Sequence, residues 1–583
     1  MSSNPLLQEF PPVSTETWEA VIRKDLKGAD YAKRLIWQSE DGLAVKPYYR
    51  AEDIAGLQYF DAPPGNFPYV RSTRANGNWR IREEIDALDR RKANQAATAA
   101  LAAGAEEIEF RTVRIRNASD LNELLANLRD VRVHFHDADE SLLQVLTEAE
   151  HSVRGGAGFD PLKNLNLAAK VLGSARPDLI PFTIDAGRFE EAGATAPQEI
   201  GFALAAGIDF LAEMHSRNVD INRAAASISF SFAIGSNYFF QIAKLRSFRL
   251  LWARAVASFG GSSEAAKAHI HARTSRWNET IYNPHVNILR GTTEAMSAAL
   301  GGADSITVAP FDECYKAPDE ASRRLARNTQ ILLKQESQLA RVSDPGGGSY
   351  YLEVITDFVA SESWKTMQGI ESAGGYQKAR AAGTIDQALA QSRAAKEKAV
   401  ATRRRVFVGT NQYPNLSEKV LDQIDNDHAA ALEQFGHRRG AELYEQIRLR
   451  TERHVARGGK NPRVLLAEIG DLKMRSARST FATNFFGCAG FDVIAQHFDA
   501  VDDIADTPAD VIVLCSSDPE YPAIAATLIA ALEERKRNIS IIVAGNPEST
   551  EQLKAMGVSD FIHVRSNPVE VLARWQQKLG VKE

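Results

Sequence analysis

The sequence has only three cysteines among its 583 residues, Cys314, Cys488 and Cys515, and they lie far apart. Because the cysteines are odd in number and widely spaced, they support neither a disulfide framework nor a cysteine-based zinc site. This cysteine content fits a reducing cytoplasm. The sequence also lacks an apolar stretch long enough to cross a membrane, and its first residues lack the basic and apolar regions of a signal peptide. We therefore expect a cytoplasmic protein that is neither exported nor inserted in a membrane.

An excess of basic residues is absent as well. The 69 lysines and arginines are outnumbered by 75 aspartates and glutamates, which gives a net charge of −6. This balance provides no general attraction to a phosphate backbone or an anionic membrane surface. We therefore expect neither nucleic acid nor membrane as a partner. The length alone suggests several domains.

Strand and helix patterns alternate in the region from residue 85 to residue 399. Six β-rich segments are clear: EEIEFRTV, VRVHFH, IPFTIDA, ISFSFAI, HIHARTS and SITVAP. Alternation of this kind over roughly 250 residues is typical of a (β/α)8 barrel. We therefore predict an α/β protein with a TIM barrel at residues 85–399, in which the remaining strands are inferred.

The regions on either side of the predicted barrel differ in pattern. Residues 1–84 predict an arm with one helix, TETWEAVIRKDL, and a turn-rich segment that must lie against a domain or a partner. Residues 400–460 are charged and helical, and stop signals at Gly458 and Pro462 mark the end of a linker. Residues 461–583 hold five apolar runs that adjoin helical stretches, which predicts a flavodoxin-like doubly wound sheet.

The first loop of that sheet is where a doubly wound domain normally binds a ligand. The strand RVLLAEI leads into GDLKMRSARSTFATNFFGCAGFDVI, which ends at residue 494. Residues 472–475 of this loop are Leu, Lys, Met and Arg. The groups that would hold a cofactor are therefore missing from the position where a cofactor is expected.

Four stretches resemble the methylmalonyl-CoA mutase family, whose members use adenosylcobalamin. They are FEEAGATAPQEIGFALAAGIDFL (189–211), IGSNYFFQIAKLRSFRLLWA (234–253), RNTQILLKQES (327–337) and RVSDPGGGSYYLE (341–353). A barrel, a helical linker and a flavodoxin-like domain also occur in this order in the family. The similarity covers nearly the whole chain, and it implies a cobalamin-binding-type domain at the C-terminus.

The resemblance implies that this domain has lost its cofactor site. In the family's catalytic chains, a D-x-H-x-x-G motif supplies a histidine that ligates cobalt from below. The histidine position falls here on Met474 or Arg475, and neither a thioether nor a guanidinium replaces imidazole. The motif's glycine falls on Ala477 or Arg478, whose side chains fill the space near the nucleotide tail. The nearest downstream histidine, His497, is interpreted as a strand-end residue.

Two later positions of the family's cobalamin contacts are partly preserved, namely Ser516 in CSSD and Gly545 in VAGN. The family has S-x-L and G-G at these positions. We therefore predict that the sheet is kept while the cobalamin site is lost.

The barrel departs from the family pattern in a similar way. Arg188 stands where catalytic chains have a histidine, and a fixed cation cannot shuttle a proton. Arg273 and Arg276 replace the Gln and Gly of the family's H-x-Q-T-S-G-W. The segment that carries the family's active-site tyrosine has no tyrosine between Arg71 and Trp79. The resemblance therefore implies no catalytic, cofactor-binding or metal-binding residue in this chain.

Arg188 and Arg273 have two interpretations. Both are expected at the ends of barrel strands, where they could hold a phosphate or carboxylate of an acyl-CoA. Alternatively, they fill a disused pocket by pairing with acidic neighbours such as Asp185 or Glu190. We favour pairing, because the companion groups for radical chemistry are also missing.

Histidine pairs at i,i+2 offer a metal-site alternative. His134 and His136 share one strand face, and so do His269 and His271. A metal could use one pair together with Asp137, but no further ligand stands at convincing spacing. We favour half-buried scaffold histidines.

Some members of the family work as heterodimers of a catalytic large subunit and a degenerate small subunit, and this pattern resembles the small one. By resemblance, the assembled enzyme interconverts (R)-methylmalonyl-CoA and succinyl-CoA with adenosylcobalamin bound by the large subunit. This chain is then expected to bury the partner's interface, with the N-terminal arm as the candidate segment for wrapping that partner. The alternative is a self-sufficient acyl-CoA-binding protein or isomerase that uses the arginine-lined barrel without cobalamin.

Overall fold

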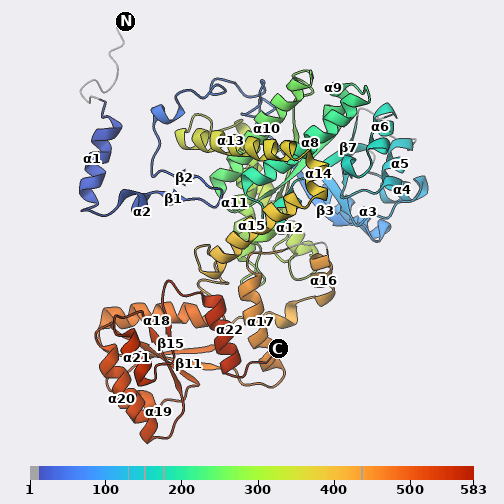
Figure 1. Cartoon of the computed structure of the whole chain (residues 1–583). Helices are drawn as coiled ribbons and strands as arrows, with labels where there is room; N and C mark the ends of the chain where they lie inside the picture. Colours follow the sequence, from blue (N-terminus) through green and yellow to red (C-terminus); the bar gives the residue numbers. More distant parts are fainter. Residues whose placement is uncertain (1–11, 129, 150–152, 175–177, 435–437, 583) are drawn as a thin grey trace.

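The computed structural model describes residues 12–128, 130–149, 153–174, 178–434 and 438–582 (Figure 1). An N-terminal arm, a closed barrel and a C-terminal sheet domain follow one another along the chain. The C-terminal domain lies beside the barrel and is reached through the helices that follow it. Within the described residues, no helix has both the length and the apolar character that a membrane crossing requires.

Eight parallel strands of the described chain close into a barrel in the order β10-β3-β4-β5-β6-β7-β8-β9. They are β3 (Arg80–Asp86), β4 (Glu107–Arg111), β5 (Arg132–Phe135), β6 (Arg154–Phe159), β7 (Leu179–Asp185), β8 (Ile228–Ile234), β9 (His269–Thr274) and β10 (Ser305–Thr307). The predicted barrel is confirmed. The two strands that were only inferred are β3 and β6.

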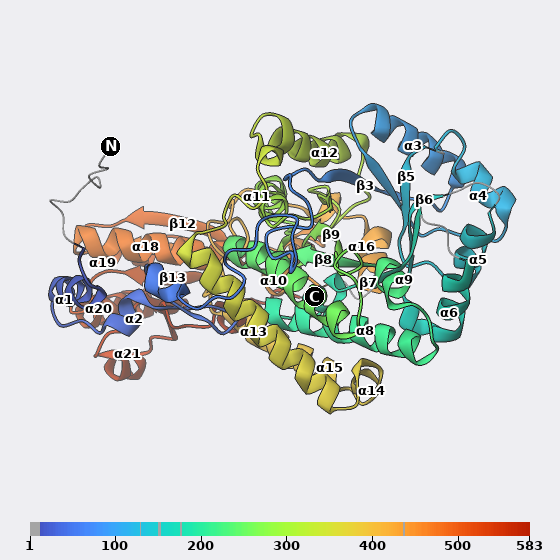
Figure 2. The ribbon, with the colours of Figure 1, turned by 90° about the horizontal axis from the view of Figure 1, so that it is seen from above.

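Helices surround the barrel and lead out of it. They are α3 (Arg90–Ala102), α4 (Ala118–Leu124), α5 (Glu140–Glu148), α6 (Leu165–Ser174), α7 (Gly187–Glu191), α8 (Ala196–Ser216), α9 (Ile221–Ala226), α10 (Tyr238–Ser258), α11 (Val286–Leu300), α12 (Glu320–Gln335), α13 (Tyr350–Ser372), α14 (Tyr376–Ala381), α15 (Thr384–Ala401), α16 (Asn426–Gln434) and α17 (Glu442–Ala456). Seen from above, α13 runs along α8 and α10 (Figure 2).

Two of the three predicted domain boundaries fall inside regular elements, and the third, between residues 460 and 461, lies in the loop between α17 and β11. Strand β3 spans the boundary between residues 84 and 85, and α15 spans the boundary between residues 399 and 400. The arm before β3 contains α1 (Thr15–Asp25), α2 (Tyr31–Leu35), β1 (Trp37–Gln38) and β2 (Ala44–Val45). Helix α1 has no buried residue and stands apart from the barrel in Figure 1. Its Trp18 ring stacks on Tyr48, with ring centroids 4.9 Å apart.

The C-terminal domain is a parallel sheet of five strands within the described residues, in the order β12-β11-β13-β14-β15. Its strands are β11 (Arg463–Glu468), β12 (Asp492–His497), β13 (Val511–Cys515), β14 (Ser540–Ala544) and β15 (Asp560–Ile562). Its helices are α18 (Leu472–Gly487), α19 (Val501–Asp506), α20 (Tyr521–Glu534), α21 (Thr550–Met556) and α22 (Pro568–Lys578). The predicted flavodoxin-like sheet is confirmed, because helices cover both faces and the central strands are continuously apolar.

Candidate functional site

The interior of the barrel is charged where such barrels are usually filled by branched apolar residues. Arg82 of β3 donates one hydrogen bond to Glu107 and one to Glu109, each 3.1 Å long. Both glutamates lie on β4 and are buried. Burial by itself raises the pKa of Glu107, but the charge of Arg82 and the nearby His134 outweigh it and hold that pKa well below its usual range.

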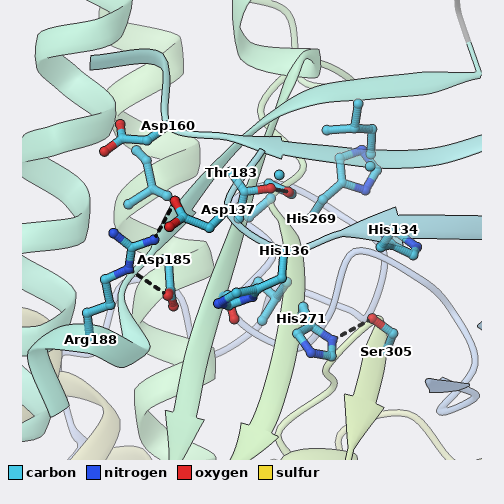
Figure 3. A pocket seen from close by; sticks show the side chains of 18 of the residues that line it. His134, His136, Asp137, Asp160, Thr183, Asp185, Arg188, His269, His271 and Ser305 are labelled. Atoms are coloured by element: carbon cyan, nitrogen blue, oxygen red, sulfur yellow. Dashed lines mark hydrogen bonds and ion pairs between the residues drawn. The ribbon is translucent and has the colours of Figure 1, made fainter. Parts of the chain in front are cut away.

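Four histidines, His134, His136, His269 and His271, line the same hollow of the barrel (Figure 3). The Nε2 atom of His134 lies 3.2 Å from Glu107, and the Nδ1 atom of His136 lies 3.1 Å from Glu109. Burial lowers the pKa of His271 to about 3, so its ring is neutral at pH 7. The ring of His269 is exposed at the start of β9. In the part of the chain that the structure describes, no three His, Cys, Asp or Glu side chains are arranged to hold a metal ion.

The carboxyl ends of the barrel strands are joined by a second charged network. Arg273 donates to Glu84 at 2.8 Å and to Glu313 at 2.6 Å. Arg276 also donates to Glu313, at 3.0 Å, and to Glu191, at 3.1 Å. Burial raises the pKa of Glu84, but the neighbouring guanidinium groups outweigh it and keep that carboxyl ionised. Arg273 is thus paired, although its partners are not the carboxylates that the sequence suggested.

Arg188 lies at the rim of the barrel, at the start of α7, and 46% of its side chain is exposed. Its Nε donates to Asp185 at 3.0 Å and its Nη2 to Asp137 at 3.1 Å (Figure 3). Asp185 is a partner that the pairing interpretation expects. Glu190 instead accepts a hydrogen bond of 2.8 Å from Ser275. The charge of Arg188 is therefore already compensated by two carboxylates.

Hollows of about 510 Å³ and about 660 Å³ lie among the described residues of the barrel. Their linings share a group of residues that includes Arg82, Glu109, His136 and His271. Basic and acidic side chains line both hollows in nearly equal numbers. The hollows therefore offer space but little net charge to attract a polyanion.

The crevice of the C-terminal sheet lies beyond the carboxyl ends of β11 and β13, where the strand order reverses. The β11 loop ends at Asp471, whose side chain accepts from the Met474 amide at 2.8 Å and so begins α18. Met474 and Arg475 thus lie in the first turn of α18. The Arg475 guanidinium donates to the carbonyl of Gly470 at 3.0 Å. The first turn therefore presents no imidazole toward the crevice.

The segment after β13, residues 516–521, fills the crevice from the other side; it consists of a turn and the first residue of α20, and we call it the 516–521 loop. The Glu520 carboxylate accepts hydrogen bonds from the hydroxyls of Ser516 and Ser517, at 2.7 and 2.6 Å. The Tyr521 hydroxyl donates to the carbonyl of Ala544 at 2.8 Å and accepts from the Ser516 amide at 3.2 Å. Glu520 also accepts a hydrogen bond from the Asp471 amide in the loop after β11. The Tyr521 hydroxyl links the end of β13 to the end of β14. Sequence reasoning missed both residues, although Ser516 and the Asp-Pro turn mark the loop.

The partly preserved Gly545 does not face open space. Arg478 donates to Asp518 at 2.9 Å, and this pair lies beside Gly545. A Cβ built on Gly545 would lie 3.2 Å from the Asp518 carboxylate and 3.5 Å from the Arg478 guanidinium. His497 is at the end of the edge strand β12, where its Nδ1 lies 2.9 Å from the carbonyl of Glu468. The residues of this crevice therefore do not fit adenosylcobalamin.

Comparison with known proteins identifies the relatives of this architecture. The methylmalonyl-CoA mutase family model matches residues 162–458. The chain is 38% identical to the methylmalonyl-CoA mutase small subunit of Porphyromonas gingivalis, over 99% of both chains. It is 32% identical to the small subunit of Streptomyces virginiae, over 99% of this chain and 98% of that protein. For the small subunit of Propionibacterium freudenreichii subsp. shermanii, the identity is 28% over 88% and 86% of the two chains. The chain belongs to the methylmalonyl-CoA mutase family, which confirms the resemblance found in the sequence.

Proposed function

We propose that this chain is the small, structural subunit of a heterodimeric adenosylcobalamin-dependent methylmalonyl-CoA mutase. The observation that carries the proposal is the filled crevice of the C-terminal sheet. Glu520, Tyr521 and the Arg478–Asp518 pair occupy the space beyond β11, β13 and β14. A family member without a cofactor crevice needs a second chain to supply the radical chemistry.

The barrel supports the same proposal. Arg188 takes the position of a family histidine, and its permanent charge cannot transfer a proton in the neutral pH range. Arg273 and Arg276 are fixed by ion pairs to buried or half-buried carboxylates. These groups stabilise the barrel rim and leave no free acid or base poised at the family positions named above.

The partner in this proposal is the catalytic large subunit, which binds adenosylcobalamin and converts (R)-methylmalonyl-CoA to succinyl-CoA in the cytoplasm. This chain contributes a rigid surface that fixes the relative position of the partner's two domains. The N-terminal arm is the proposed wrapping segment, since Trp18, Val21 and Trp37 are 47%, 56% and 48% exposed. Such an interface should exceed the standard size of roughly 1,600 Å².

Co-expression with the companion chain tests the proposal. We expect the two chains to purify together, the complex to be active, and this chain alone to be inactive. After mixing with adenosylcobalamin and gel filtration, the isolated chain should retain no corrin absorbance, while the complex should retain it. Mutase activity in this chain alone, or a corrin that co-elutes with it, would refute the assignment.

The second candidate is a self-sufficient acyl-CoA-binding protein or isomerase without cobalamin. The two barrel hollows of about 510 and 660 Å³ favour it, because they leave room for a ligand. Calorimetric titration of the isolated chain with methylmalonyl-CoA and succinyl-CoA separates the candidates. Micromolar affinity without a partner would support the second candidate, whereas no binding at high micromolar concentration would eliminate it.

A further inference from the structure

The Glu520 carboxylate occupies the place where a doubly wound sheet normally receives the anionic part of a ligand. Four donors converge on a single oxygen, Oε2. The hydroxyls of Ser516 and Ser517 lie 2.7 and 2.6 Å away, and the amides of Ser517 and Asp471 both lie 3.2 Å away. These donors come from the loops after β13 and after β11, on the two sides of the reversal in strand order. The four donors form what we call the anion cradle.

The geometry of the β11 loop matches a site for a compact anion. Gly470 adopts a positive φ of 80°, and a Cβ built there would lie 2.5 Å from Oε2 of Glu520. Only glycine lets the backbone come this close at that conformation. The cradle therefore combines close backbone approach with converging amides and hydroxyls, as anion sites in proteins do.

Helix capping does not account for Glu520. The residue precedes α20, but its side chain makes no capping hydrogen bond with the first amides of that helix. Its carboxylate turns back onto the Ser516 hydroxyl and the Ser517 amide and hydroxyl of its own turn, and it also accepts from the Asp471 amide of the β11 loop. The hydrogen bonds from Ser517, Ser516 and the Asp471 amide lower the pKa of Glu520 to about 2, so the cradle holds a full negative charge at pH 7.

We propose that the 516–521 loop is an internal plug, in which Glu520 takes the place of a bound oxyanion in a cradle that can bind inorganic phosphate. Asp518 completes the plug, because it neutralises the Arg478 guanidinium that stands beside the same crevice. The plug prevents this domain from competing for anionic ligands. This inference rests on the loop geometry alone and does not require the proposed function.

The test compares three full-length proteins: the wild type, Glu520→Ala and Glu520→Gln. Each is titrated with inorganic phosphate at constant ionic strength. The alanine variant empties the cradle, whereas glutamine keeps it filled without the charge. We expect E520A to bind phosphate with a dissociation constant on the order of 1 mM, typical of a few charge-assisted hydrogen bonds. At 10 mM phosphate, the unfolding midpoint of its C-terminal domain should rise by a few degrees. The wild type and E520Q should not respond.

A second variant separates the cradle from a general loss of negative charge. Adding Ser516→Ala and Ser517→Ala to E520A removes the hydroxyl donors and should weaken phosphate binding by at least tenfold. If E520A is poorly folded without phosphate, the same titration is read as recovery of its native circular dichroism. A folded E520A that ignores phosphate, a wild type that binds it equally, or unchanged binding in the triple variant would overturn the proposal. Failure of the heterodimer assay leaves these readouts unaffected.

Discussion

The barrel and the C-terminal domain have departed from the family pattern in opposite ways. The barrel still contains hollows among its described residues, and its altered positions are arginines paired with carboxylates across the lumen. The C-terminal crevice is filled by one loop, residues 516–521. In both regions the apolar layers are intact, as the fully buried β13 and the Phe230, Phe248 and Trp252 cluster illustrate.

This difference shows which part of each fold is free to change. The barrel lumen is enclosed by strands, so a replaced side chain must find a partner across the lumen or remain an unpaired buried charge. The crevice of the sheet is bounded by loops, which can be rebuilt without disturbing the strands. The barrel is therefore expected to depend on its ion pairs, and the C-terminal domain on loop packing.

The largest effect is expected from Arg273→Ala. The change removes one of two close basic partners from each of Glu84 and Glu313, which keep Arg111 and Arg276, and the lost charge-assisted hydrogen bonds should destabilise the barrel by about 3 kcal/mol. Hydrogen exchange with mass spectrometry, measured along a urea titration, gives the stability of barrel peptides and of C-terminal peptides separately. Peptides of the C-terminal domain should be unchanged. A barrel loss below about 1 kcal/mol would show that the network is not needed for stability.

A pH-dependent effect is expected from Glu294 of α11. Burial raises its pKa to about 8, while its Oε1 accepts a 2.8 Å hydrogen bond from Asn278. The folded chain therefore keeps a proton that the unfolded chain releases near pH 4.5. This contribution to stability is complete below pH 4.5 and is lost as the pH rises toward 8. We expect the free energy of unfolding of the barrel to fall by up to a few kcal/mol between pH 5 and 8.5.

Glu294→Gln supplies the matched control, because the amide has a similar shape and does not titrate. Between pH 5 and 8.5, the free energy of unfolding of the barrel should fall less in E294Q than in the wild type. Equal slopes for the two proteins would mean that Glu294 is ionised in the folded barrel. The same comparison should leave the C-terminal peptides unaffected, since Glu294 lies outside that domain.

A smaller effect is expected from Tyr521→Phe in the C-terminal domain. The change removes the hydroxyl that bridges the Ser516 amide and the Ala544 carbonyl, both buried at the carboxyl ends of the interior strands β13 and β14. A loss of about 1–2 kcal/mol is expected for buried groups left without a partner. Hydrogen exchange of peptides from β13 and β14 measures it. Faster exchange in the barrel instead would contradict the separation of the two regions.

The smallest effect is expected from Arg188→Ala. Its side chain is nearly half exposed and its ion pairs with Asp137 and Asp185 are open to solvent, so the loss should stay below about 1 kcal/mol and shrink in high salt. Thermal unfolding at low and high ionic strength checks this. If R188A instead abolishes an acyl-CoA affinity found in the wild type, Arg188 is a ligand-binding residue and the barrel is a working site.

The extent to which the fold was predictable follows from where side chains are buried. The five strands of the C-terminal sheet were recognised because they read as apolar runs, and the central strands β11, β13 and β14 are covered on both faces. Strand β3, RIREEID, was not recognised because its inward side chains are charged. Strand β6, RGGAGF, was missed because its glycines serve close packing, and a Cβ on Gly158 would overlap the carbonyl of Phe135.

For the candidate site, the sequence shows which residues of the family motifs are replaced but not the contacts that the replacing residues make. The absence of a histidine at Met474 and Arg475 is a local property, so the altered cobalamin loop was readable from the sequence. The partners of Arg273 were not, because Glu84 lies on the strand that carried no pattern and Glu313 follows the last barrel strand. Glu520 was missed because its cradle joins two loops about 50 residues apart.

The sequence by itself determined the class of each domain, six of the eight barrel strands, the five strands of the C-terminal sheet, the family and the absence of a histidine from the first turn of α18. These are local properties of residue type and spacing. Only the tertiary structure decided which charges meet in the barrel, that hollows remain there, and that one loop closes the crevice of the sheet. Such outcomes depend on side chains brought together by strand pairing across long stretches of chain, and no local pattern records them.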